Sequence, residues 1–275
     1  MQAAERGNPE ERKLKIKDSI LREQETISVI QKKDNNQEQA ADESRNIRLM
    51  ALNAGMGTSA SNLQNRKIPV SNVGEYIGEV YKDLPHGKGR LEYYNKDMYE
   101  GGFTNGLREG FGLLLTAEGE KYQGQWSQDM KNGLGTYYEA DGSIYEGEFL
   151  GGLREGEGKY TLPDGTVFVG FFANNLFDYG DLRFSDGRSY QGEWSKGLMH
   201  GRGVFKEPNG TVYAGHFKAG KKEGYGEMVY PDGRSYQGEW KDDLMHGKGT
   251  ITTAEKQLVE AVWEKGEQKE VIKSG

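Results

Sequence analysis

The sequence is dominated by an internal repeat of 23 residues that returns eight times, with one interval of 22 residues. Each unit begins with a large aromatic residue, followed two positions later by glycine and after two more by a second bulky residue. The leading residues are Tyr76, Tyr99, Tyr122, Tyr145, Phe168, Tyr190, Tyr213 and Tyr236. Self-similarity at a fixed period indicates a repeat architecture, in which each unit is stabilised by packing against its neighbours.

The order of residues within one unit predicts a β-hairpin. A spacing of two places the leading aromatic residue, the glycine and the second bulky residue on the same face of a strand. A Gly-x-Gly pair, such as Gly201 and Gly203, then opens a second strand. The unit closes on a dipeptide such as Asp186-Gly187. Such dipeptides accept positive φ at both central positions, as hairpin turns require.

The glycines share a face with the aromatic residues, and this arrangement predicts how the hairpins hold together. A bare glycine lets a neighbouring ring lie flat over the backbone. One hairpin alone is marginal in water, whereas a stack of hairpins buries a continuous face. We therefore predict an all-β repeat array over residues 75–263, with an α-helical N-terminal extension. The array is expected to be an elongated, twisted, single-layer antiparallel sheet of consecutive β-hairpins.

Residues 1–70 contain no repeat and are predicted to form a polar N-terminal extension. A helix is expected over residues 9–33, a second over 37–53, and a linker over 54–70. The apolar residues of the first helix are candidates for partner binding: Leu14, Ile16, Ile20, Leu21, Ile27 and Ile30. Two interpretations of the extension remain open, a solvated and partly folded tail or a docking helix that binds another chain.

The fifth unit is irregular, because it is one residue short and has Asp178 in place of the first glycine of Gly-x-Gly. Phe171 occupies the face on which other units carry a glutamate, and Phe177 and Tyr179 follow nearby. One interpretation is a bulge that bends the array. The other is an apolar contact patch for a partner, formed by Phe171, Phe177 and Tyr179. Residues 264–275 form a charged tail that is expected to cap the last sheet edge or to fray.

Composition narrows the classes of function. The 275 residues include no cysteine, which excludes disulfides, thiolate metal ligands and cysteine nucleophiles. Residues 1–70 hold 12 basic and 10 acidic side chains, and the rest of the chain holds 24 and 33. An acidic array does not attract nucleic acid over a long range, so we expect no nucleic-acid partner. No segment resembles a membrane helix or a signal peptide, and we expect a cytoplasmic protein.

No group of residues predicts catalysis, a metal site or a cofactor. His86, His200 and His246 hold equivalent positions in separate units. Strand spacing puts the last two about 20 Å apart, too far to share a metal ion. The glutamates that recur opposite the aromatic residues, such as Glu193, are expected to form a ladder of equivalent, solvated groups. Acid–base catalysis requires carboxylates with separated pKa values, so we expect a protein without enzymatic activity.

The repeated residues resemble the MORN repeat family. The resemblance rests on Tyr-x-Gly-Glu-Trp, then Gly-Leu-x-His-Gly-x-Gly, then Asp-Gly, recurring in register over most of the chain. Val80 in the first unit and Asp178 in the fifth depart from this pattern. The resemblance implies an elongated, curved sheet with a scaffolding role. Such arrays occur in ciliary radial-spoke head proteins, in cytoskeletal and junctional proteins, and beside lipid kinase and methyltransferase domains, and lipid binding has been proposed for them.

The leading functional hypothesis is a structural scaffold that docks other proteins of a large cytoskeletal assembly. Its most specific form is the axoneme of the cilium or flagellum, by resemblance to radial-spoke head proteins. A first alternative is a membrane-associated scaffold that binds phosphoinositides, although the acidic total weighs against it. Its candidate cluster is Lys218, Lys221 and Lys222 with Arg108 and Arg154. A second alternative is a regulatory subunit of an enzyme on another chain.

Overall fold

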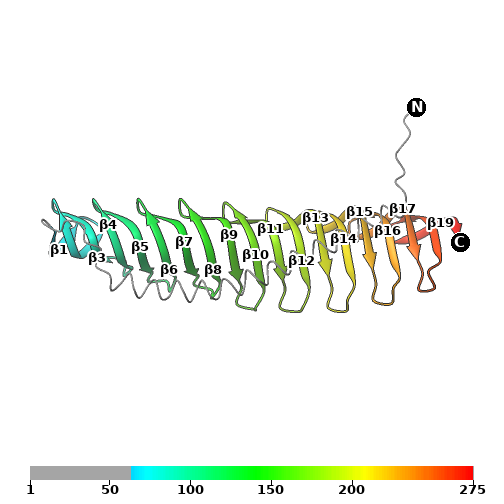
Figure 1. Cartoon of the computed structure of the whole chain (residues 1–275), viewed down its shortest axis with the longest axis horizontal. Coiled ribbons are helices and arrows are strands. Elements are labelled where there is room, and N and C mark those ends of the chain that lie inside the picture. The colour runs from blue at the N-terminus through cyan, green and yellow to red at the C-terminus, as the bar shows by residue number, and fades with distance from the viewer. Residues whose placement is uncertain (1–62, 275) are drawn as a thin grey trace, which may run out of the picture. The chain divides into compact units, whose positions relative to one another are not determined.

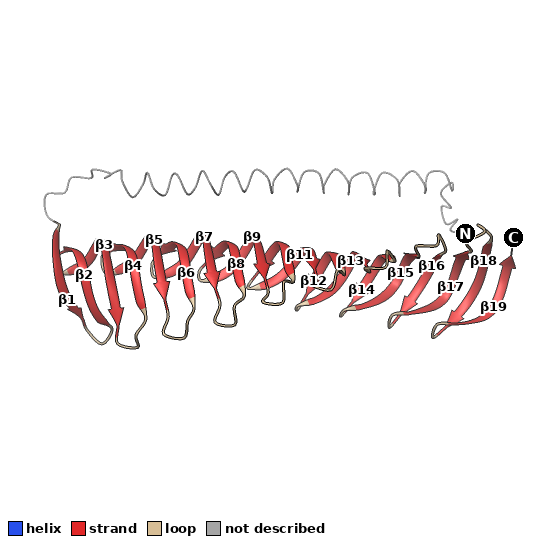
Figure 2. Ribbon diagram, turned by 90° about the horizontal axis from the view of Figure 1, so that it is seen from below, coloured by secondary structure: helices blue, strands red, loops and turns tan. Residues whose placement is uncertain are grey.

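The computed structural model describes residues 63–274, which form one antiparallel sheet of 19 strands (Figure 1). Each strand pairs with its neighbours in the sequence, from β1 (Gln64–Val70) with β2 (Gly74–Tyr81) to β18 (Leu258–Glu264) with β19 (Glu267–Ser274). The strands lie side by side in a single layer and change their inclination along it (Figure 2), as strand twist requires. The predicted all-β array is confirmed, and residues 63–274 contain no helix.

The predicted N-terminal helices over residues 9–33 and 37–53 lie outside the described residues. The same holds for the six apolar candidates of the first helix, Leu14, Ile16, Ile20, Leu21, Ile27 and Ile30. Their proposed role in partner binding therefore stays a prediction.

Two kinds of strand alternate between β1 and β19. The strands with the leading aromatic residue are β2, β4 (Met98–Thr104), β6 (Lys121–Ser127), β8 (Ile144–Leu150), β10 (Val167–Ala173), β12 (Ser189–Ser195), β14 (Val212–Lys218) and β16 (Ser235–Lys241). β18 is the ninth strand of this kind and has Val259 at the leading position. The strands that complete each hairpin are β3 (Leu84–Tyr93), β5 (Leu107–Leu115), β7 (Met130–Tyr138), β9 (Leu153–Thr161), β11 (Leu176–Arg183), β13 (Leu198–Lys206), β15 (Lys221–Val229) and β17 (Leu244–Thr252). The hairpins follow the order that the repeat predicts.

The core lies on the face that carries the leading aromatic residues, which we call the ring face. None of these eight residues is more than 1% exposed. Their rings lie against glycines, and a Cβ placed on Gly158 would come within 2.6 Å of the Tyr145 ring. Tyr122 meets Trp126 of its own strand edge to face at 5.2 Å and Phe149 of the next unit at 5.1 Å. Because each buried ring contributes roughly 1.5–3 kcal/mol, the stability of a unit depends on its neighbours.

Each regular hairpin contains a β-bulge. The bulge explains why the first residue of the Gly-x-Gly pair is glycine and why the leading aromatic residue is tyrosine. Gly201 has a φ of 58°, and the register of β12 against β13 shifts just before Glu193. A bulge of this kind needs a residue that adopts left-handed backbone angles. The Tyr190 hydroxyl donates to the carbonyls of Glu193 at 2.8 Å and His200 at 3.2 Å, on either side of the bulge. The fifth unit lacks the bulge glycine and carries Phe168, which has no hydroxyl.

The turns differ from the expectation for the Asp-Gly dipeptides. Positive φ at both central positions occurs inside the hairpins, as at Asn174-Asn175 (50° and 69°), and this is the type I′ pattern. In the Asp-Gly turns between hairpins only the glycine has positive φ, as at Gly142 (92°). The Asp141 carboxylate there accepts the Ser143 N–H at 2.8 Å. The prediction for these dipeptides was wrong because the aspartate side chain holds a different turn.

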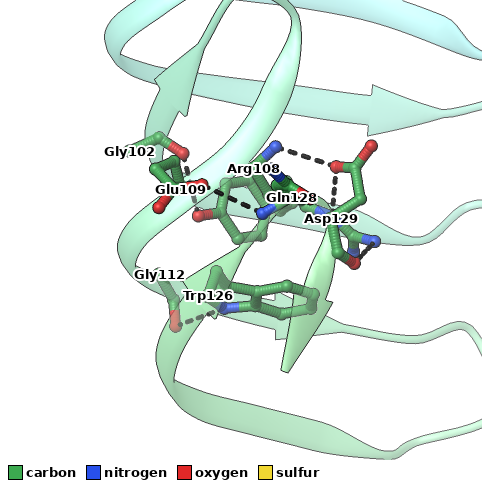
Figure 3. Close-up of polar contacts among 8 residues, drawn as sticks. Gly102, Arg108, Glu109, Gly112, Trp126, Gln128 and Asp129 are labelled. Atoms are coloured by element: carbon green, nitrogen blue, oxygen red, sulfur yellow. Dashed lines mark hydrogen bonds and ion pairs between the residues drawn. The ribbon is translucent and has the colours of Figure 1, made fainter. Parts of the chain in front are cut away.

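Neighbouring units are joined by repeated hydrogen bonds in addition to the sheet ladder. The second turn residue donates its N–H to the preceding hairpin, as Asp129 does to the Arg108 carbonyl at 3.1 Å. The Trp126 indole N–H donates to the Gly112 carbonyl at 3.3 Å (Figure 3). The Arg108 guanidinium lies 4.1 Å from the Trp126 ring and forms an ion pair with Asp129 at 3.1 Å. The turn hydrogen bonds recur with the period of the repeat, and Trp240 repeats the indole bond of Trp126.

The series is interrupted between β11 and β12, a boundary that we call the seam. Among the described residues, the series of N–H bonds from the turns to the preceding hairpin has no member at Gly197. The buried indole N–H of Trp194 has no acceptor, as is also true of Trp263 in the last hairpin. The β11–β12 pairing has five register pairs, whereas β9–β10 has six. The buried side chains form two clusters that meet at the same boundary, one ending at Leu182 and one beginning at Tyr190, and Trp194 packs against both. The fifth unit is one residue short, and its bulge leaves only Asp178 without a cross-strand partner in its hairpin, whereas the bulge of the next unit leaves Gly201 and Arg202.

Two strands lie where a linker and a charged tail were predicted. Residues 64–70 of the predicted linker 54–70 form β1, which pairs with β2. Pro69 is accommodated because β1 is an edge strand and needs no N–H donor on its outer side. Residues 267–274 of the predicted tail 264–275 form β19, which covers the edge of β18. Neither strand carries the aromatic–glycine motif, so the repeat pattern did not reveal them.

Candidate functional site

The face opposite the ring face, which we call the open face, presents large apolar side chains to solvent. Along each strand, the side chains of the open face alternate with those of the ring face. In the row across the strands that runs beside the Gly-x-Gly pairs, five apolar side chains of this face are 46% to 62% exposed: Phe111, Leu134, Phe171, Tyr179 and Tyr225. Phe111 pairs across strands with Gln125, and Leu134 with Glu148. Phe171 and Tyr179 are the only two of the five that pair directly with each other.

These two residues form the centre of an exposed apolar patch in the fifth unit. Phe171 on β10 is 46% exposed, and Tyr179 on β11 is 48% exposed. Val169 lies two residues before Phe171 on the same face and is 44% exposed. We call Val169, Phe171 and Tyr179 the fifth-unit patch. The structure thus brings together two of the three residues that the sequence predicted here and adds Val169.

Phe177, the third predicted residue, lies on the ring face instead. It pairs with Phe172, stacks on Phe168 at 4.0 Å and meets Trp194 edge to face at 5.4 Å. The register places Asp178 opposite no residue. Phe177 and Tyr179 therefore point to opposite faces of the sheet. In a regular strand, side chains that are two residues apart point to the same face.

Carboxylates flank the fifth-unit patch on both sides. Phe171 pairs with Glu157 of β9, and Tyr179 pairs with Glu193 of β12. Four adjacent strands thus carry the row Glu157, Phe171, Tyr179 and Glu193, which spans about 14 Å at ordinary strand spacing. Glu157 is exposed, and its carboxylate has no hydrogen bond or ion pair with any described residue. The arrangement is a pair of adjoining aromatic rings with negative charge at each end.

The recurrent glutamates also have a structural role that the sequence analysis missed. The Glu193 carboxylate accepts the Arg202 N–H at 2.9 Å, directly after the bulge glycine. Gln125 accepts the Leu134 N–H in the same way at 2.8 Å. The prediction of a merely solvated ladder was therefore wrong for these positions, because the side chains fold over the bulge and satisfy a backbone donor.

Basic side chains cover the rings on the opposite face of the sheet. The Lys131 ammonium lies 3.5 Å from the centre of the Tyr137 ring, and burial lowers the pKa of this amine to about 8. Arg154 lies 4.8 Å from the Tyr160 ring and pairs with Glu139 at 2.8 Å. These cations neutralise local carboxylates and pack on aromatic rings, which partly buries their stems.

The structure does not gather the basic residues of the predicted phosphoinositide cluster. Arg108 is on β5 and Arg154 is on β9, while Lys218, Lys221 and Lys222 belong to the β14–β15 hairpin. Lys221 pairs with Asp242 of the next hairpin at 2.9 Å. Most of these charges are engaged within the sheet.

The remaining polar features are dispersed. A shallow depression of about 460 Å³ is lined by residues that include His200, His216, Glu223 and Tyr225. Within residues 63–274, no three His, Cys, Asp or Glu side chains come together in a group that could hold a metal ion. The same residues contain no helix with the length and apolar character of a membrane span.

Comparisons with solved structures find similar but distant chains. The TCP10 domain of Danio rerio CPAP is 14% identical, with 76% of this chain and 99% of that chain covered and a TM-score of 0.44. The SAS-4 TCP domain of Drosophila melanogaster, in complex with a proline-rich motif of Ana2, is 13% identical, with 76% and 96% covered and a TM-score of 0.29. TM-scores below 0.5 do not establish a shared fold, so what these proteins bind does not bear on this chain.

No curated protein sequence matches the chain. The family model of the MORN repeat matches seven segments, residues 76–98, 99–121, 122–144, 145–167, 190–212, 213–233 and 236–255. It passes over the fifth unit, residues 168–189, where the structure has its seam. The matched segments cover more than half of the 275 residues. With hairpins, ring stacking and bulges that recur in the same register, the chain belongs to the MORN repeat family.

Proposed function

We propose that this chain is a non-catalytic structural scaffold that docks other proteins in a cytoskeletal assembly. The observation that supports the proposal is that the repeated residues serve the fold itself. The rings and glycines build the ring face, Glu193 and Gln125 hold backbone donors at the bulges, and the ring-face cations pack on aromatic side chains. The long open face remains accessible to a partner. Within it, the fifth-unit patch is where two aromatic side chains adjoin.

The setting that we propose is the ciliary axoneme, supported by the resemblance of the repeat motifs to those of radial-spoke head proteins. A fold by itself does not assign a function, so the setting needs a direct test. The full chain would be added in increasing amounts to salt-extracted axonemes and sedimented. We expect saturable binding at a fixed ratio to the axonemal proteins. A chain that stays in the supernatant, or that pellets without saturation, would contradict the proposal.

A membrane arm completes this test. The full chain would be mixed with phosphoinositide-containing vesicles at physiological salt and floated on a density gradient. We expect no lipid-dependent flotation, because the basic residues are spread over separate hairpins and Lys221 is paired with Asp242. Flotation that depends on the phosphoinositide would favour the membrane-associated alternative.

A further inference from the structure

We propose that the fifth-unit patch binds a basic amphipathic helix of another protein. The inference rests on the proposed scaffold function and specifies the chemistry of one partner. It starts from the row Glu157, Phe171, Tyr179 and Glu193 on four adjacent strands.

The position of the row within the sheet favours a helix over an added strand. Strands β9 to β12 are each paired on both sides, so their backbone groups are engaged in the sheet ladder. An added strand needs a sheet edge with free N–H and C=O groups. A partner on this interior face therefore contributes side chains, and a helix satisfies its own backbone hydrogen bonds while doing so.

The spacing of the two rings matches one helical turn. Neighbouring strands are about 4.8 Å apart, so Phe171 and Tyr179 present adjoining apolar surfaces at that separation. A helix laid across the strands advances about 1.5 Å per residue, which puts side chains at i and i+3 or i+4 about 4.5–6 Å apart. Two large apolar residues one turn apart would thus contact both rings, with Val169 beside them.

The charges at the ends of the row specify basic residues on the partner. Glu157 and Glu193 are about 14 Å apart, a distance that a helix covers in about nine residues. The basic side chains that β9 to β12 carry on the open face are already paired, because Lys159 lies 3.7 Å from Glu146 and Arg183 pairs with Asp181 at 3.2 Å. The next basic side chain along the row, Arg202 of β13, lies beyond Glu193. A lysine or arginine at each end of the helix would face a carboxylate and could also lie over the exposed ring of Tyr179.

Binding along this row would also bridge the seam. The pair Tyr179 and Glu193 joins β11 to β12 across the boundary where the turn and indole hydrogen bonds are missing. A helix that contacts both sides would resist local separation of these two strands. Amide hydrogen exchange of β11 and β12 should therefore slow when the partner is bound.

The test uses the full chain and three fluorescein-labelled synthetic helical peptides. The first carries two leucines one turn apart and a lysine at each end, the second replaces the lysines by glutamate, and the third replaces the leucines by serine. Binding would be measured by fluorescence anisotropy at physiological salt. The protein variants are Phe171→Ser with Tyr179→Ser, Glu157→Gln with Glu193→Gln, and the control Phe111→Ser. Gln125 shows that glutamine serves the structural role of Glu193.

We expect the first peptide alone to bind, the double serine variant to bind it about tenfold more weakly or worse, and the glutamine variant to bind it several-fold more weakly. The Phe111→Ser variant should bind like the parent chain and share its circular dichroism spectrum with the other variants. Equal binding of the leucine and serine peptides, equal loss in the Phe111→Ser control, or no binding of the first peptide would overturn the inference. Saturable binding to axonemes would then still support the scaffold function, so the two can fail separately.

Discussion

Trp194 and Trp240 close two identical pentapeptides, Tyr-Gln-Gly-Glu-Trp, but their indole N–H groups differ. Trp240 donates to the Gly226 carbonyl at 3.2 Å, as Trp126 does to Gly112 at 3.3 Å. The Trp194 N–H is buried without an acceptor among the described residues. Replacing each of the two tryptophans of the identical pentapeptides by phenylalanine therefore makes the same chemical change in two different hydrogen-bonding situations.

The two substitutions should lower local stability by different amounts, and the hydrogen bonds of the two indoles set the difference. Trp240 is 5% exposed and Trp194 is only partly buried, so Trp240→Phe loses at least as much ring packing as Trp194→Phe. Trp240→Phe also loses a hydrogen bond worth about 1 kcal/mol, whereas Trp194→Phe removes a buried unsatisfied donor that costs about 1–3 kcal/mol. Trp240→Phe should therefore be more destabilising than Trp194→Phe by about 2–4 kcal/mol.

The assay must resolve local stability, because repeat arrays need not unfold in one step. Native-state hydrogen exchange would give the opening free energy of β12–β13 in one variant and of β16–β17 in the other. Equal losses of local stability at the two sites, or a larger loss for Trp194→Phe, would refute the assignment of the seam.

Three further predictions concern the ring face. Gly112→Ala places a Cβ against the Tyr99 ring and should cost roughly 3 kcal/mol, whereas Gly110→Ala meets open space at a φ of 72° and should cost about 1 kcal/mol, as native-state hydrogen exchange of β4 and β5 would measure; similar costs would contradict the ring-over-glycine packing. Tyr145→Phe removes the hydroxyl that donates to the Glu148 carbonyl at 2.9 Å and should lower the local opening free energy of β8 and β9 by about 1 kcal/mol, as measured by native-state hydrogen exchange; an unchanged opening free energy would show that the hydroxyl does not stabilise the bulge. Burial raises the pKa of Tyr145 from 10.0 to about 12, so this stabilisation is complete below pH 10 and is lost as the pH rises through 12; tyrosinate absorbance that appears near pH 10 while the sheet signal is intact would contradict it.

The regular part of the fold could be predicted because its local rules agree. Ring, glycine and bulky residue recur at strand spacing, and each has a separate physical use in the structure, so Tyr190 and Gly203 predict the same hairpin. The turns were harder, because Asp-Gly accepts more than one turn type and Asp141 selects one by binding the Ser143 N–H. β1 and β19 carry no motif and depend on the sheet edges that they cover.

The candidate site was predicted only in part, because the sequence does not show that Asp178 has no cross-strand partner. The sequence reveals that the fifth unit is short but not which residue loses its cross-strand partner. That detail decides the faces of Phe177 and Tyr179, because a bulge reverses the alternation of side chains. The hydrogen bond from Arg202 to Glu193 was equally hidden, since it depends on the backbone conformation of Gly201.

If the fifth-unit patch binds a protein partner, its side chains must lie within crosslinking distance of that partner in the cell. This is measured by photo-crosslinking in the native cells, with benzoylphenylalanine in place of Phe171 and, as the matched control, in place of Phe111, which is also exposed on the open face. We expect one discrete protein adduct from position 171 that is absent from position 111. A lipid adduct, the same adducts from both positions, or no adduct from position 171 would contradict it.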